Sequence, residues 1–342
     1  MILSRVFLFP YWLALRLRNA AYDKGRRRAV RHPVPVISVG NLTAGGTGKT
    51  PMVEYLIRLL HGRNHVAVLS RGYKRHSRGF RMVKADDKAL VCGDEPLQIK
   101  RKFPDIPVAV DKDRNHGVGQ LLALPEGERP DLILLDDGFQ YRKLQPSLNL
   151  VLVDFNRPIF HDNLLPIGHL RDLPEQIRRA DAVIVTKTPH QLEALERLEL
   201  RQQLRLRHDQ PMLVSSLRYG EMQPVFPEQA DRHYLYSKEV YVFSGIADDR
   251  PLLAYLTDSY DSIDHEQFGD HHRFTRADQR ALVRYARRHP RTLLLTTEKD
   301  AMRLLHCTRL DDAVRSRLFF VPVEMAFQTP EEAAAFAKII CQ

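Results

Sequence analysis

The sequence of 342 residues has few cysteines and no long apolar run, and each shortage argues against a class of protein. Its three cysteines, Cys92, Cys307 and Cys341, form no C-x-x-C pair, which argues against a disulfide framework or a cysteine zinc site and favours a reducing cytoplasm. No apolar stretch reaches the ~18 residues that a membrane-spanning helix needs. With 44% hydrophobic and 27% charged residues, the chain is not disordered. We therefore expect a globular protein of about two domains.

Acidic residues are scarce in the first 32 residues, where eight basic residues stand against one acidic residue. This segment holds +7 of the formal net charge of +10, so the rest of the chain is nearly neutral. Its apolar run, residues 6–15, lacks the small-residue cleavage site of a signal peptide. We predict that residues 1–22 form a helix, bent at Pro10, in the membrane interface, with the basic stretch 24–31 facing anionic headgroups. The alternative is a helix packed on the protein's own core, with solvated arginines.

A glycine-rich loop, G-N-L-T-A-G-G-T-G-K-T at residues 40–50, follows a β-branched run and precedes an apolar-periodic stretch. A strand, a glycine-rich turn and a helix in this order present backbone N–H groups to phosphate oxygens at a helix N-terminus. Lys49 adds a positive charge, and the Thr50 hydroxyl can reach Mg²⁺. Thr43 replaces the first glycine of the general motif. The predicted phosphate-binding residues are Thr43, Ala44, Gly45, Gly46, Thr47, Gly48, Lys49 and Thr50.

A second strand of buried type, residues 131–135, is followed by the paired carboxylates Asp136 and Asp137. Parallel strands bring their ligands to the carboxyl edge of the sheet, where one carboxylate would hold Mg²⁺ or its water shell. Capping of the next turn is the alternative role of the pair. Together with the glycine-rich loop, this strand predicts a site for ATP or GTP and leaves the phosphate acceptor open.

The order of predicted elements indicates an α/β fold. Strands at 34–39, 66–70, 107–110, 131–135, 149–153 and 182–186 alternate with helical stretches such as 51–61 and 95–102, which is typical of a parallel sheet. We predict an N-terminal interfacial helix and basic segment at 1–32, a P-loop NTPase-like core at 33–215, a connecting segment at 216–238 and a smaller C-terminal α/β domain at 239–342. Residues 276–289 are predicted as a basic helix, either a solvated face or a lipid contact.

The motifs along most of the chain, residues 36–301, resemble those of the tetraacyldisaccharide 4'-kinase family, the lipid A 4'-kinases. Thr43, which departs from the general loop pattern, is what this family has there. The further matching motifs are L-S-R-G-Y-K-R at 69–75, G-D-E-P at 93–96, D-D-G-F-Q at 136–140, L-L-P at 164–166 with Gly168 and L-R at 170–171, R-A-D at 179–181, D-H-H at 270–272 and T-E-K-D-A at 297–301.

The resemblance implies transfer of the ATP γ-phosphate to the 4'-hydroxyl of a tetraacylated glucosamine disaccharide 1-phosphate. It also implies that the enzyme works at the cytoplasmic face of a bacterial inner membrane, as a peripheral protein with an anionic membrane surface as its partner. ATP and Mg²⁺ are the implied cofactors. We expect no nucleic-acid ligand, and no obligate protein partner is evident.

The resemblance also assigns roles to single residues. Asp94 matches the family's proposed base and His271 its partner, although Asp94 and Glu95 before Pro96 also fit a plain helix start. Because the two residues are 177 positions apart, their pairing would place the site between the domains. The residues implied in catalysis are Asp94, His271, Lys49, Asp137 and Arg171; Arg114 is implied in nucleotide binding, and Thr50, Glu95, Asp136 and Asp172 in metal binding. Asp172 stands where the family commonly has Glu, Tyr141 where His is common, and His272 receives no role.

Two other classes of function use parts of the same pattern. A membrane-associated P-loop ATPase or GTPase acting as a switch would have the same loop but would need no acceptor base. A nucleic-acid binder is suggested only by the positive charge, which is concentrated at one end and lacks interleaved aromatic residues.

Overall fold

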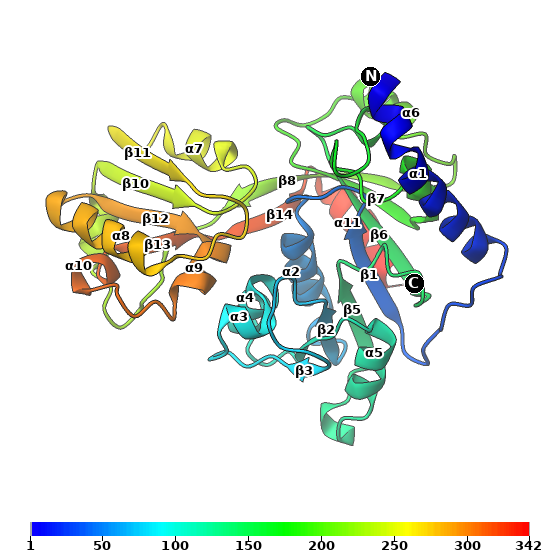
Figure 1. The fold of residues 1–342 in the computed structure, drawn as a ribbon, viewed down its shortest axis with the longest axis horizontal. Helices are drawn as coiled ribbons and strands as arrows, with labels where there is room; N and C mark the ends of the chain where they lie inside the picture. The colour runs from blue at the N-terminus through cyan, green and yellow to red at the C-terminus, as the bar shows by residue number, and fades with distance from the viewer. Residues whose placement is uncertain (1, 342) are drawn as a thin grey trace.

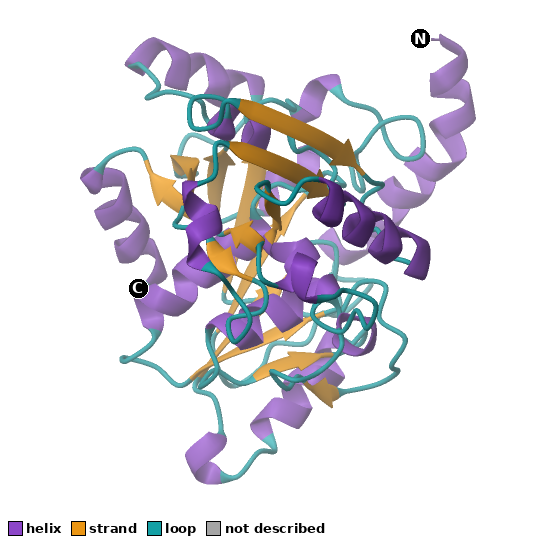
Figure 2. Cartoon of the chain, turned by 90° about the vertical axis from the view of Figure 1, so that its left-hand side faces the viewer, coloured by secondary structure: helices purple, strands orange, loops and turns teal. Residues whose placement is uncertain are grey.

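The chain forms two lobes, each built on its own sheet (Figure 1). The computed structural model describes residues 2–341, with side chains from residue 8 onward. The larger lobe lies on the right of Figure 1 and holds a nine-stranded sheet; the smaller lobe on the left holds a five-stranded sheet. Figure 2, turned by 90°, shows helices packed around both sheets and the N-terminal helix standing at the edge of the molecule.

The larger sheet is parallel except at its two ends, where β14 runs antiparallel to β8 and β3 antiparallel to β4. Its strands in spatial order are β14 (Val323–Phe327), β8 (Met212–Tyr219), β7 (Ala182–Thr186), β6 (Leu148–Asp154), β1 (Val36–Asn41), β5 (Leu132–Asp136), β2 (Val66–Ser70), β4 (Val108–Val110) and β3 (Arg81–Met82). Its helices are α1 (Ile2–Asp23), α2 (Lys49–Leu60), α3 (Ala89–Cys92), α4 (Asp94–Lys102), α5 (Arg114–Leu122), α6 (Ala194–Gln203) and α11 (Pro330–Ile340).

The smaller sheet is parallel apart from β9, which pairs antiparallel with β13. Its strands in spatial order are β11 (Ser262–Gln267), β10 (Glu239–Ser244), β12 (Leu293–Thr297), β13 (Leu318–Val321) and β9 (Gln223–Pro224). Its helices are α7 (Arg250–Leu256), α8 (Arg276–Arg288), α9 (Glu298–Leu304) and α10 (Asp312–Arg315). Short 3₁₀ turns occur at Glu126–Glu128, Ile159–His161, Pro174–Arg179 and Arg232–Tyr236.

The predicted α/β class and the six predicted core strands are confirmed, each strand lying within two residues of its predicted bounds. The central strands β1, β2, β5 and β7 are buried along their whole length because helices cover both faces of the sheet. The strands β1 and β5 lie side by side, with Val39 opposite Asp136. This register brings the ends of both predicted nucleotide motifs to one edge of the sheet.

The end of the chain does not stay in the smaller lobe. We predicted residues 239–342 as one C-terminal domain, but β14 and α11 return to the larger lobe, where β14 pairs with β8. Aromatic packing explains the return, since Phe327 and Phe336 contact Tyr55 of α2 at ring-centroid distances of 5.4 and 5.8 Å. The predicted connecting segment 216–238 likewise contains the end of β8 and the strand β9, so the two lobes share it.

The predicted N-terminal helix is present as α1, with Pro10 inside it; residue 1 of the predicted range lies outside the described residues. One side of α1 packs on the larger lobe through Leu15, which is buried, and Trp12, which is partly buried. Phe9, Leu13 and Leu17, spaced four residues apart, are 55%, 38% and 62% exposed. No helix among residues 2–341 is long and apolar enough to cross a membrane.

Candidate active site

The glycine-rich loop connects β1 to the first turn of α2. Gly48, with a φ of 86°, precedes the helix in a left-handed conformation that a side chain would strain. The Asn41 side-chain amide donates to the Thr47 hydroxyl at 2.7 Å, and the Thr186 hydroxyl donates to the Thr47 carbonyl at 2.9 Å. These bonds hold the loop to β1 and β7, with Lys49 and Thr50 in the first turn of α2.

Asp136 and Asp137 follow β5 directly beside this loop, but their surroundings differ. Asp136 is fully buried; its Oδ2 accepts from the Ser70 hydroxyl at 3.0 Å, and its Oδ1 has no hydrogen-bond partner among the described residues. Burial, together with the negative charges of Glu95 and Asp137, raises the pKa of the Asp136 carboxyl to about 7. A cation next to that unpaired oxygen would relieve both the lost hydrogen bond and the repulsion.

Asp137 is held ionised by basic side chains. Arg171 makes two hydrogen bonds to its carboxylate, at 2.9 and 2.7 Å, and the Lys49 ammonium lies 3.8 Å away. Burial alone would raise the pKa of Asp137, but Lys49 and Arg171 outweigh it and keep that pKa well below its usual range. Arg114 completes the group, because its Nη2 donates to the Asp137 carbonyl at 3.4 Å and its Nε has no partner within the described chain.

The arrangement fits ATP with Mg²⁺. Three cationic side chains and backbone N–H groups at the start of α2 face one sheet edge, where phosphate oxygens would be stabilised. Within the described range, 2–341, no three His, Cys, Asp or Glu side chains are grouped to hold a metal on their own. Magnesium is commonly held by one or two carboxylates together with substrate phosphates, and Asp136 with Thr50 supplies such a partial set.

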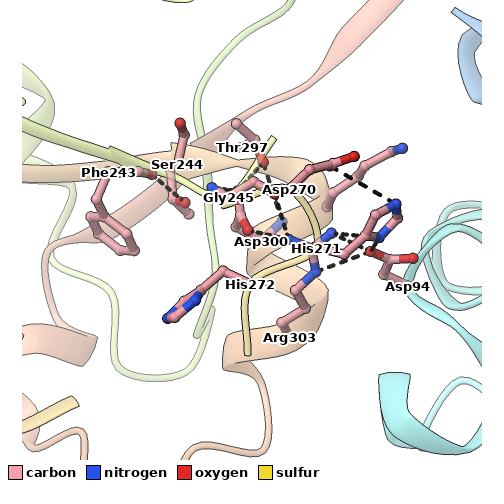
Figure 3. Close-up of polar contacts among 12 residues, drawn as sticks. Asp94, Phe243, Ser244, Gly245, Asp270, His271, His272, Thr297, Asp300 and Arg303 are labelled. Atoms are coloured by element: carbon pink, nitrogen blue, oxygen red, sulfur yellow. Dashed lines mark hydrogen bonds and ion pairs between the residues drawn. The ribbon is translucent and has the colours of Figure 1, made fainter. Parts of the chain in front are cut away.

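Asp94 and His271, which the sequence separates by 177 residues, are in direct contact (Figure 3). Asp94 begins α4 of the larger lobe, and His271 follows β11 of the smaller lobe with a φ of 58°. His271 Nδ1 lies 2.9 Å from Asp94 Oδ2, and the His271 backbone N–H donates to the Gly245 carbonyl at 2.9 Å. These two side chains, one from each lobe, therefore meet where the lobes contact each other, as their predicted pairing requires.

Two basic residues of α9, which we did not single out in the sequence, complete this group. Arg303 donates to Asp94 Oδ2 through Nε, at 3.0 Å, and also through Nη2, while its Nη1 donates to Asp300 Oδ1 at 2.6 Å. Lys299 donates to Glu95 Oε1. Lys299 belongs to the T-E-K-D-A motif, and Arg303 follows Lys299 by four residues, which is about one helical turn. Continuing the motif as a helix places both basic side chains on one face, and this pattern would have identified them.

These contacts determine the charge of Asp94. Burial alone would raise the pKa of its carboxyl, but the His271 hydrogen bond and the charges of Arg303 and Lys299 hold it well below its usual range. Glu95 connects this group to the nucleotide motifs, since it pairs with Lys299 and its charge also raises the pKa of Asp136. The Asp94 and Asp136 regions therefore form one continuous electrostatic site.

Three further residues, whose roles the sequence left unsettled, make contacts outside the two carboxylate groups described above. Asp172, predicted as a metal ligand, is instead bonded to α1, through Arg18 at 2.9 Å and Asn19 at 2.8 Å. The structure therefore does not bring Asp172 to Asp136. His272 faces Asp278 at 2.9 Å and is turned away from Asp94 (Figure 3). Tyr141 donates its hydroxyl to Asp113 at 2.7 Å, and the Arg114 guanidinium lies 5.1 Å from the centre of its ring.

Comparison with known proteins points to one family. The model of the family described as tetraacyldisaccharide-1-P 4'-kinase matches residues 1–341. A tetraacyldisaccharide 4'-kinase of Parabacteroides distasonis is 42% identical over 327 residues, which cover 94% of this chain and 89% of the relative. A protein of the same name from Bacteroides thetaiotaomicron is 40% identical over 335 residues, covering 93% and 88%.

A solved structure agrees with this match. The crystal structure described as the "apo" form of LpxK from Aquifex aeolicus in complex with ATP superposes with a TM-score of 0.72 at 29% identity, covering 98% of each chain. The family model and both relatives span nearly the whole chain, beyond the residues 36–301 that carried the resemblance. This chain therefore belongs to the tetraacyldisaccharide-1-P 4'-kinase family.

Proposed function

We propose that this chain is an ATP-dependent kinase that transfers the γ-phosphate of ATP to the 4'-hydroxyl of a tetraacyldisaccharide 1-phosphate. The Asp94–His271 pair carries the proposal, because it lies largely shielded from solvent where the lobes meet and is electrostatically continuous with the nucleotide motifs. A nucleotide switch would need no such pair, whereas a sugar hydroxyl is a weak nucleophile that must lose a proton as it attacks. Family membership supplies the identity of the acceptor.

In this mechanism the basic side chains stabilise phosphate charge. Three basic side chains surround Asp137: Lys49, Arg114 and Arg171. They can stabilise the negative charge that develops on the transferred phosphoryl group. Asp136 and Thr50 would hold Mg²⁺, and Glu95 would add negative charge beside it. When bound, Mg²⁺ would supply positive charge that neutralises the phosphate groups. Positioning and charge neutralisation are the main contributions a protein makes to phosphoryl transfer.

The Asp94–His271 pair would take up the hydroxyl proton. Its two members share one hydrogen bond, so the apparent pKa that a rate profile reports belongs to the pair. Arg303 keeps Asp94 ionised, so its carboxylate can accept a hydrogen bond as the proton is taken up. Because each member comes from a different lobe, a complete pair requires that the lobes be in contact.

The test is incubation with labelled ATP and a tetraacyldisaccharide 1-phosphate, followed by mapping of the phosphorylated position. We expect a 4'-phosphate, loss of turnover in Asp94→Asn, and retained ATP binding in that variant. His272→Ala is the matched control, since this neighbouring histidine faces Asp278, and it should keep its activity. A product without a 4'-phosphate contradicts the proposal, and hydrolysis of ATP independent of the disaccharide favours the switch instead.

We further propose that α1 seats the protein on the cytoplasmic face of a bacterial inner membrane. The exposed row Phe9, Leu13 and Leu17 gives an apolar surface, and the basic segment 24–31 follows it, which is the pattern of an interfacial helix. The double variant Phe9→Ser, Leu17→Ser should lower sedimentation with anionic vesicles. Leu195→Ser, Leu198→Ser on α6, also exposed, is the control. Equal sedimentation of the α1 variant and the wild type contradicts this placement.

A further inference from the structure

Arg171 and Asp172 are consecutive in the chain, yet their side chains contact different parts of the molecule. Arg171 binds Asp137 at the nucleotide motif, and Asp172 binds α1. We propose that Asp172 is a positioning residue, which fixes the Arg171 segment to α1 so that the helix sets the place of Arg171 in the active site. This inference rests on the proposed function, and it replaces the metal-ligand role that we predicted for Asp172.

The contact of Asp172 with α1 is buried and fully bonded. The Asp172 side chain has no solvent exposure; its Oδ1 accepts from Asn19 Nδ2 at 2.8 Å and from the Leu173 backbone N–H at 2.9 Å, and its Oδ2 accepts from Arg18 Nη2 at 2.9 Å. A buried carboxylate is costly unless it is paired and hydrogen-bonded. Two of the three donors belong to α1, so Asp172 is stable in this position only while α1 stays docked.

The Arg171 side of the same dipeptide is equally constrained. The Arg171 backbone N–H donates to the Leu42 carbonyl at 2.8 Å, and its guanidinium binds Asp137 and the Asn41 side chain. The Tyr11 hydroxyl of α1 donates to the Arg171 carbonyl at 3.5 Å. Since consecutive Cα atoms are only about 3.8 Å apart, a displacement of α1 cannot be absorbed between the two residues. It is passed on to the guanidinium that binds Asp137 at the nucleotide motif.

Arg142 makes further contacts with the C-terminal end of α1. Its Nη1 donates to the Asn19 side-chain oxygen at 3.3 Å and its Nη2 to Asp23 Oδ1 at 2.6 Å. Asn19 therefore donates to Asp172 and accepts from Arg142, which fixes its amide orientation. The donors to Asp172 are thus held in place independently of any ligand in the active site.

Kinetics of Asp172→Asn test the proposal. The amide cannot accept from both Arg18 and Asn19, so we expect kcat to fall by about tenfold, as a misplacement of catalytic groups by a fraction of an ångström would produce. The KM for ATP, the Mg²⁺ concentration for half-maximal rate and sedimentation with anionic vesicles should each stay within about twofold of the wild type, because the phosphate site and the exposed face of α1 are unchanged.

Variants of α1 make the test specific. Arg18→Gln should lower kcat in the same direction, and the double variant Arg18→Gln, Asp172→Asn should be no slower than Asp172→Asn alone. Arg16→Gln is the matched control, since it removes one positive charge from the same helix but its exposed side chain lies over Trp12. It should keep the wild-type kcat. Should Asp172→Asn fail to fold, Arg18→Gln carries the test, because the Arg18 side chain is 32% exposed.

Each of four results would overturn the proposal. A strongly raised Mg²⁺ requirement in Asp172→Asn would show a metal ligand, and unchanged kcat in Asp172→Asn or Arg18→Gln would show that no coupling exists. If the decreases in kcat add in the double variant, Arg18 and Asp172 act separately. If kcat decreases only in variants that also lose vesicle binding, the effect comes from membrane attachment alone. If the wild type itself makes no 4'-phosphate, the proposed function fails, which is a distinct outcome.

Discussion

Replacing Arg303 by methionine removes the guanidinium that neutralises Asp94 and keeps most of the aliphatic stem. The side chains of Arg303 and Asp94 are 8% and 7% exposed, so their ion pair is barely screened by solvent. Removing one partner of a buried pair costs about 3–5 kcal/mol, because the remaining charge stays buried without compensation. Asp300 loses the same cation but keeps its bonds to the Gly245 N–H and the Thr297 hydroxyl, which limits the additional cost.

The pH dependence gives the substitution a second, independent signature. In the wild type the pKa of Asp94 lies below its ordinary value, so its contribution to stability is present above about pH 3.9 and is lost as the pH falls through the lower folded value. Without Arg303 that pKa rises. The difference in stability between wild type and variant should therefore shrink as the pH falls below about 4, and the acidic limb of the kcat/KM profile should move to higher pH.

Thermal unfolding and rate profiles measure both effects. We expect Arg303→Met to lower the melting temperature by roughly 10 °C at neutral pH and to shift the acidic limb by about one pH unit or more. Arg309→Met, an exposed arginine just after α9, is the control and should change stability by less than about 0.5 kcal/mol. A loss of stability below about 1 kcal/mol together with an unmoved acidic limb would refute the assignment of Arg303 as the counter-charge of Asp94.

Three further predictions concern other parts of the molecule. Lys49→Met should weaken ATP binding by about 10–100-fold in calorimetric titration, since it removes a charged hydrogen-bond donor to phosphate; equal affinity would contradict its place at the phosphates. Burial and the Glu54 charge raise the pKa of Glu298 to about 7. The stability of the wild type should therefore fall as the pH rises from about 4.5 through 7. The variant Glu298→Gln should lose this pH dependence and should melt at a higher temperature than the wild type at pH 8. An unchanged slope would show that another group titrates. Removal of Mg²⁺ by a chelator should abolish turnover, with recovery on its return; persistent turnover would refute a metal-dependent transfer.

The strands and the nucleotide motifs could be predicted because their signals are local. Buried parallel strands such as 66–70 and 182–186 are unbroken apolar runs, and the loop before Lys49 has a spacing that few other structures require. The pairing of Asp94 with His271 came from resemblance alone. Nothing in the neighbourhood of either residue in the sequence indicates a partner 177 positions away.

The parts that escaped prediction depend on long-range packing. The return of β14 to the larger sheet depends on the packing of Phe327 and Phe336 against Tyr55, which no local sequence pattern indicates. Asp172 was predicted as a metal ligand from the resemblance, yet its carboxylate binds Arg18 of α1, whereas the neighbouring Arg171 binds Asp137. Arg303 and Lys299 were missed because a charged helix such as α9 is usually solvated, whereas here it closes the contact between the lobes.

The return of β14 and α11 also has a consequence for biosynthesis. Synthesis runs from the N-terminus, and domains of long chains generally fold as units in that order. Here the helix that follows the phosphate loop packs against residues 323–340, which are synthesised after the whole of the smaller lobe. The larger lobe cannot complete its sheet until the intervening smaller lobe has been made. A chain stalled or cut before residue 323 would leave β8 without its partner strand and α2 without part of its apolar cover. The packing around α2, the helix that begins at the phosphate loop, is therefore complete only once both lobes have been synthesised.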